Sequence, residues 1–123
     1  MQLHGRVEKA WGYEDIWVSN DKYCCKFLNF TQIGAKFSMH FHKEKHETWR
    51  VMSGEFKVVT IDTTDATQTA FHLREGDVFD LEPMRPHQLT CIAEGAIIEV
   101  STPDSVEDNY RVLPGDSQTK GTT

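Results

Sequence analysis

The stretch HFHKEKHE, residues 40–47, places three histidines and two glutamates within eight positions. In the strand-like run KFSMHFH (36–42), alternate side chains point to opposite faces, so His40 and His42 share one face. Cα atoms two residues apart in a strand are about 7 Å apart, which lets two imidazoles converge on one ion. Glu47 follows a turn that we expect to be solvated, and it can add a carboxylate. This spacing predicts a metal site.

A fourth ligand comes from a later part of the chain. The run PMRPHQL offers His87 at the start of a strand, behind a turn that two prolines make rigid. The predicted metal ligands are therefore His40, His42, Glu47 and His87. Three imidazoles and one carboxylate suit one divalent transition metal, which can be Zn, Fe, Mn, Ni or Co. The alternative, surface histidines on an edge strand, does not explain why four ligand types occur at fitting spacings.

Short segments rich in β-branched and aromatic residues make up most of the chain, and no window indicates a long helix. The expected strands span 23–30, 36–42, 48–52, 55–62, 69–73, 77–81, 87–92 and 96–101. Glycine- and proline-containing turns separate them. Many short strands of this kind favour an all-β sandwich or a small barrel with room for one small ligand.

The length of 123 residues suits one domain. We expect residues 1–22 to form an N-terminal segment with an edge strand, and residues 23–112 to form the barrel. Residues 113–123 are polar and irregular, so we expect a C-terminal tail whose last residues are disordered.

The formal net charge is −6, and Lys and Arg form no dense block, which argues against a nucleic-acid partner. No apolar run has the length of a membrane span, and the N-terminus lacks the apolar core of a signal peptide. The three cysteines are an odd number, which favours reduced thiols. These features predict a cytoplasmic protein.

Two motifs carry a family resemblance. The spacing of glycines, histidines and glutamate in residues 34–54 resembles the first motif of the cupin superfamily without a gap. Residues 76–87 resemble the second motif, although Pro83 lies one position late, Arg85 replaces a usual glycine, and Cys91 follows in place of a usual asparagine. The resemblance implies a small jelly-roll β-barrel.

A narrower resemblance extends over roughly residues 8–112. The stretches EKAWGYED (8–15), SGEFKVV (53–59) and EVSTPDSVEDNYRV (99–112) are similar to the cupin domain of type II mannose-6-phosphate isomerases. Those domains often carry a glutamine where this chain has His40. The resemblance implies aldose–ketose isomerisation of a sugar phosphate, a reaction that needs a Lewis acid and a base.

Candidate residues for this reaction follow from the alternation of the strands. Glu99 in IIEVS is the first candidate for the base, with Glu47 and His46 as alternatives. His46 breaks the two-residue alternation, which is more typical of an exposed turn. Lys36 lies on the ligand face of its strand and is the best candidate to bind a phosphate. Weaker candidates are Lys26, Arg50, Arg85 and Arg111.

Two other functions use the same ligands. An Fe(II)-dependent dioxygenase would need an apolar pocket, for which the candidate residues are Phe37, Phe41, Met52, Phe56 and Phe79. A non-catalytic cupin would bind a sugar or another metabolite around a structural metal. Exposed sheet edges and an aromatic N-terminal segment that can swap between copies favour a homodimer. Turnover of a hexose phosphate, oxygen uptake, and binding without turnover distinguish the three functions.

Overall fold

A computed structural model describes residues 5–116, which form nine β-strands and confirm the predicted all-β class. The strands are β1 (Gly5–Lys9), β2 (Gly12–Ser19), β3 (Cys24–Phe30), β4 (Met39–Phe41), β5 (Glu47–Ile61), β6 (Gln68–Arg74), β7 (Val78–Leu81), β8 (His87–Ser101) and β9 (Tyr110–Leu113). No helix in this part of the chain is long and apolar enough to cross a membrane. The expected tail beyond residue 116 lies outside the described residues.

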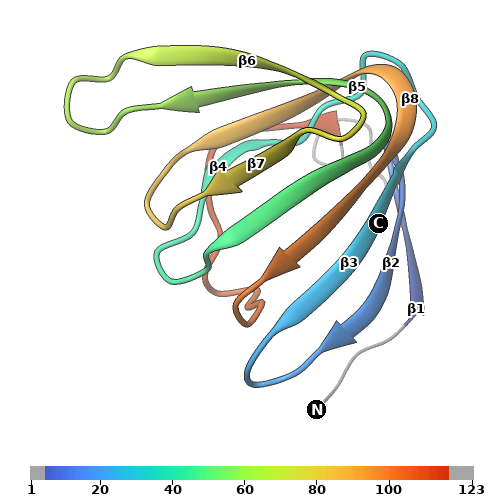
Figure 1. The fold of residues 1–123 in the computed structure, drawn as a ribbon. Coiled ribbons are helices and arrows are strands. Elements are labelled where there is room, and N and C mark those ends of the chain that lie inside the picture. Colours follow the sequence, from blue (N-terminus) through green and yellow to red (C-terminus); the bar gives the residue numbers. More distant parts are fainter. Residues whose placement is uncertain (1–4, 117–123) are drawn as a thin grey trace.

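The sheet is built around β5 and β8, which pair antiparallel along their lengths (Figure 1). One path of hydrogen-bonded strands runs β1-β2-β3-β8-β4-β9, and β5 also pairs with β6 and β7. Both ends of β8 therefore have neighbours: its last residues pair with β3, and its first residue pairs with β4. The sheet curls around an interior, and the hairpin of β1 and β2 extends its edge beyond β3.

Two glycines allow the long strands to bend where they face each other. Each long strand joins two segments that the sequence predicted separately, and the β5–β8 register shifts near residues 51–56. A Cβ on Gly54, which has φ +83°, would lie 2.6 Å from the carbonyl oxygen of Ala93. A Cβ on Gly95 would lie 2.1 Å from the carbonyl oxygen of Ser53. Only glycine fits this contact, and the resulting bend curls the sheet into a barrel.

The core lies on the inward face of the curled sheet, next to a polar cavity. Phe56, Val58 and Leu89 are fully buried, and Trp11 stacks on Phe30 with ring centroids 4.5 Å apart. Along β3 the buried side chains alternate with partly exposed ones. Phe30 and Leu28 on that inward face are apolar, whereas Lys26 is charged, so the interior changes from core to cavity along one strand.

Candidate metal centre and ligand cavity

Three histidines meet beside the cavity, and two of them, His40 and His42, line it. His40 on β4 pairs directly with His87, the first residue of β8, and His42 follows β4. Their ligand nitrogens all lie within 4.8 Å of one another, and the rings of His40 and His87 have centroids 4.5 Å apart. Such a group of nitrogen donors can hold one divalent metal ion.

The hydrogen bonds of the three rings fix which nitrogen faces the metal position. The Nδ1 atom of His40 lies 2.9 Å from the carbonyl oxygen of Ser38, and that of His87 lies 2.9 Å from the carbonyl oxygen of Arg85. The Nδ1 atom of His42 lies 2.5 Å from the carbonyl oxygen of Asp108. A carbonyl oxygen only accepts, so each Nδ1 carries the proton and each Nε2 keeps a free lone pair.

The environment of His87 gives a direct test of whether a metal fits. Its Nε2 is buried and has no hydrogen-bond partner among residues 5–116. A buried polar atom without a partner costs about 1–3 kcal/mol, and native proteins rarely leave one unsatisfied. A metal ion bound by the three Nε2 atoms would satisfy it, so the donors present fit a divalent cation.

Glu47, the predicted fourth ligand, begins β5 beside this group. One carboxylate oxygen lies 3.5 Å from Nε2 of His42, and the other accepts a hydrogen bond of 2.8 Å from the Trp49 indole. Burial and then the nearby Glu99 carboxylate raise the pKa of Glu47. Both effects penalise the carboxylate in the absence of a cation, so the position of Glu47 suits a metal ligand.

Burial also sets the protonation of the histidines. It lowers the pKa of His40 to about 4 and the pKa of His87 to about 3. Both imidazoles are therefore neutral at pH 7, which is the form that binds metals.

These pKa shifts predict how stability depends on pH in the metal-free protein. Below pH 6.5, His40 and His87 take up protons on unfolding, so the free energy of unfolding falls as the pH falls. Glu47 acts in the opposite direction because its pKa is raised in the folded state, but two imidazoles outweigh one carboxyl group. We expect a net loss of about 1 kcal/mol per pH unit between pH 6.5 and 5.

Urea unfolding of chelator-treated protein at pH 7, 6 and 5 measures this slope. His87→Gln should reduce the slope by about one proton, because that side chain no longer titrates. His72→Gln is the control, since His72 is exposed and pairs with Glu55 at the surface. An unchanged slope in His87→Gln would contradict the assignment of His87 as a buried neutral base.

The turn between His42 and Glu47 was expected to be solvated, and this is wrong for Lys45. Lys45 is only 5% exposed. The carboxylate of Asp108 accepts hydrogen bonds from the backbone N–H groups of Lys45 and of the two residues before it. This cap fixes the turn, and Lys45 lies inside the barrel.

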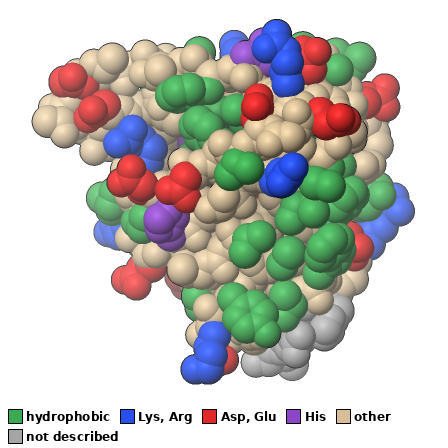
Figure 2. Space-filling view, viewed as in Figure 1, with side chains coloured by type: hydrophobic (Ala, Val, Ile, Leu, Met, Phe, Trp, Pro, Cys, Tyr) green, Lys and Arg blue, Asp and Glu red, His purple; other side chains and the backbone are tan. Residues whose placement is uncertain are grey.

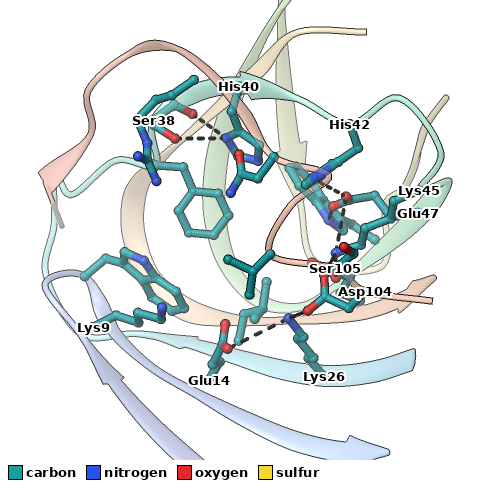
Figure 3. A pocket seen from close by; sticks show the side chains of 18 of the residues that line it. Lys9, Glu14, Lys26, Ser38, His40, His42, Lys45, Glu47, Asp104 and Ser105 are labelled. Carbon is teal, nitrogen blue, oxygen red and sulfur yellow. Dashed lines mark hydrogen bonds and ion pairs between the residues drawn. The ribbon is translucent and has the colours of Figure 1, made fainter. Parts of the chain in front are cut away.

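Lys45 is the centre of a buried network of charges (Figure 3). Its Nζ lies 2.9 Å from Glu99, 3.1 Å from Asp104 and 3.7 Å from Glu47. Lys26 lies 2.7 Å from the other oxygen of Asp104. Burial alone would lower the pKa of Lys45, but the carboxylates of Glu99, Glu47 and Asp104 raise it, so the ammonium stays charged.

Removal of this ammonium should destabilise the fold. Lys45→Met would leave the buried carboxylate of Glu99 without the ammonium 2.9 Å away, and loss of one partner of a buried ion pair typically costs about 3–5 kcal/mol. Chemical denaturation at pH 7 measures the loss. Lys57→Met, at an exposed position of β5, is the matched control and should change stability by less than about 0.5 kcal/mol. Equal stabilities of the two variants would show that the network contributes nothing.

The cavity has a volume of about 340 Å³ and contains several of the residues predicted from the sequence. Lys36 and Glu99 line it together with His40, His42 and Glu47. Two of the weaker candidates, Lys26 and Arg111, also line it. Sequence reasoning missed Lys9, Glu14, Lys45 and Asp104.

Besides His87, three predicted residues do not line the cavity. His46 lies outside, with its Nε2 2.8 Å from Asp80, because the side chains of adjacent residues leave the strand on opposite faces. Arg50 is exposed on β5. Arg85 belongs to the turn before β8 and contributes its backbone carbonyl to His87. The structure therefore gives these side chains no contact with the metal position.

Most of the aromatic set expected for an apolar pocket also lies elsewhere. Phe37 lines the cavity, but Phe56 belongs to the core and Met52 is 43% exposed. Phe41 stacks on Tyr110, outside the cavity lining. Phe79 packs against the core. The cavity wall is mainly polar and charged.

No family model matches the sequence, and no curated protein matches it. Among solved structures, the capsular polysaccharide assembling protein CapF from Staphylococcus aureus aligns over 92% of the chain, with a TM-score of 0.74 and 14% identity. Oxalate decarboxylase from Bacillus subtilis aligns over 100%, with a TM-score of 0.73 and 21% identity. KdgF from Halomonas sp. aligns over 77%, with a TM-score of 0.63 and 18% identity. These proteins have the cupin fold.

The chain has the cupin fold. It spans 33% of the length of CapF and 37% of that of oxalate decarboxylase, against 81% of KdgF. At these identities the similarity shows the jelly-roll barrel and no particular reaction. The cupin fold explains why histidines from β4 and β8 meet on the inner face of the barrel.

Proposed function

We propose that this cupin is a metal-dependent enzyme that interconverts the aldose and ketose forms of a sugar phosphate. One observation carries the proposal. The three-histidine group suited to a metal contributes His40 and His42 to the lining of the same cavity, of about 340 Å³, that the buried carboxylate of Glu99 lines. The similarity of residues 8–112 to the cupin domain of type II mannose-6-phosphate isomerases supports the same reaction.

The isomerisation moves one proton between neighbouring carbons through an enediol or enediolate. A divalent ion held by His40, His42, His87 and Glu47 would supply the Lewis acid that polarises the carbonyl. Glu99 is the proposed base, which takes the proton from one carbon and returns it to the next. Burial acts to raise the pKa of Glu99, but the nearby ammonium groups of Lys45 and Lys26 have the larger, opposite effect. The pKa is therefore below its ordinary value, and the carboxylate is ionised and can accept a proton.

The charges of the cavity support an anionic substrate. Five cationic and four anionic side chains line it, a net of +1 with neutral histidines, although the whole chain carries −6. Lys45 and Lys26 are neutralised by carboxylates. Lys9, Lys36 and Arg111 form no ion pair within residues 5–116, so they are available to bind a phosphate. A hexose phosphate suits a cavity of this size.

A coupled assay of the conversion of mannose 6-phosphate to fructose 6-phosphate tests the proposal. The protein is loaded separately with Zn, Mn, Co, Ni and anaerobic Fe(II), and His42→Ala is the control. Turnover that disappears in His42→Ala would support the isomerase and identify the working metal. Absence of turnover with every fully loaded metal would reject it.

The second candidate is binding of an anionic sugar without turnover. It is favoured by the lowered pKa of Glu99, because a carboxylate held by a lysine 2.9 Å away is a weak base. Calorimetry with mannose 6-phosphate and metal-loaded protein would distinguish the two functions. Binding with no turnover would favour this candidate.

We also propose a cytoplasmic location. Cys24, Cys25 and Cys91 are free thiols. Reduced cysteines are typical of the reducing cytoplasm. Fractionation of the source cells measures the location directly.

A further inference from the structure

The convex side of the sheet carries an exposed hydrophobic surface, opposite the cavity. We call the outward side chains Trp17, Cys25, Phe27, Ile98 and Val100 the outer face. Trp17 is 49% and Val100 53% exposed, and Trp17 stacks on Phe27 with ring centroids 6.0 Å apart. Figure 2 shows hydrophobic side chains gathered over β3 and its neighbours. Apolar surfaces of this extent mark interaction sites.

The strand register places opposite charges on the two sides of an apolar pair in one row across this face. Arg50 on β5 lies opposite Ile98 on β8, Ile98 lies opposite Phe27 on β3, and Phe27 lies opposite Asp15 on β2. Arg50 is exposed and forms no ion pair within residues 5–116. In the next row, Val100 lies opposite Cys25.

This pattern is self-complementary. A two-fold axis that runs along the strands between β3 and β8 exchanges β8 with β3 and β5 with β2. Ile98 of one copy would then face Phe27 of the other, and Arg50 would face Asp15 on both sides of this apolar centre. Beyond them in the row, Val78 on β7 would face Arg6 on β1. A symmetric dimer needs one surface that contains both members of each contact, and this row contains them.

The size of the surface also fits a dimer. Four hydrophobic side chains on or beside the outer face are 49–59% exposed: Trp17, Tyr23, Val78 and Val100. A half-exposed aromatic side chain such as Trp17 or Tyr23 presents about 100 Å² to solvent. Together with partly exposed Phe27 and Ile98, these four side chains offer on the order of 500 Å². A standard interface buries about 800 Å² on each partner, of which a little over half is apolar.

We propose that the outer face binds the outer face of a second copy of this chain, with Arg50 paired to Asp15 of that copy. The interface lies on the side of β3 and β8 opposite the cavity, because Lys26 and Glu99 point inward where Phe27 and Val100 point outward. Both cavities stay open in this dimer. The contact involves no exchange of the N-terminal hairpin, which pairs with β3 of its own chain.

Sedimentation equilibrium of the full-length wild-type protein and five variants tests this arrangement. Arg50→Asp and Asp15→Arg should each weaken the dimer by about 10-fold or more, since each places two like-charge pairs in the interface. The double variant should recover to near the wild-type dissociation constant, because the charges are exchanged. A role of either residue in its own fold would not produce this recovery.

Val100→Asp should also disrupt the dimer, whereas Val112→Asp should not. Val112 is the matched control, because it is 50% exposed but lies on β9, away from the outer face. Circular dichroism of each variant verifies the fold. A wild-type protein that stays monomeric at its highest soluble concentration would overturn the proposal. A dimer unaffected by Val100→Asp, or no recovery in the double variant, would also overturn it.

Discussion

Replacing His42 with alanine should release most of the bound metal and abolish turnover. His42 supplies one of three Nε2 donors, and its Nδ1 is held by the carbonyl oxygen of Asp108. Removing a residue that only hydrogen-bonds to a metal ligand already weakens metal binding by about 10–100-fold. Removing a ligand itself should therefore lower the metal affinity by more than about 100-fold. Elemental analysis after dialysis against a weak chelator measures the remaining metal. His87→Ala should have the same effect.

Glu47→Ala tests the carboxylate separately. We expect this variant to lose most of its metal too, because the carboxylate lies 3.5 Å from Nε2 of His42. His46→Ala is the matched control, since this histidine is one residue away in the chain but pairs with Asp80 outside the cavity. Full metal content in His42→Ala and His87→Ala would disprove the assigned centre. Full content in Glu47→Ala alone would leave a three-histidine site.

The metal position was predictable because it depends on short-range spacing. The separation of His40 and His42 by two residues places both rings on one side of a strand in any sheet. A proline-containing turn precedes His87, and the structure pairs His87 directly with His40. The all-β class followed from the same alternation of side chains over most of the chain.

The charge network depends on contacts between distant residues, which one sequence does not reveal. The sequence HKEKHE is typical of a solvated turn, and Lys45 is buried because Asp108, 63 residues later, caps that turn. Lys26 and Glu99 lie opposite each other only because β3 pairs with β8 in that register. Arg50 and Arg85 were candidates on charge alone, and strand direction places Arg50 outside the barrel.

Glu99→Gln should reduce kcat by about 10²–10⁴-fold while the metal content stays unchanged. Glutamine has nearly the same shape but cannot take up the proton, and general base catalysis contributes rate factors of this size. Glu99 is not among the metal-ligand group, so metal analysis should not change. KM should change little, because Lys9, Lys36 and Arg111 remain available for the phosphate. Steady-state kinetics on protein loaded with the working metal measures both constants.

The matched control for Glu99 is Glu14, another glutamate that lines the cavity. Glu14 lies 3.8 Å from Lys26, farther than the 2.9 Å that separates Glu99 from Lys45. Glu14→Gln removes a carboxylate from the same cavity and should lower kcat by less than about 10-fold. If both variants lose activity equally, the charge of the cavity matters and Glu99 is not the base. If Glu99→Gln keeps its kcat, Glu47 becomes the remaining carboxylate close enough to the metal position to take the proton.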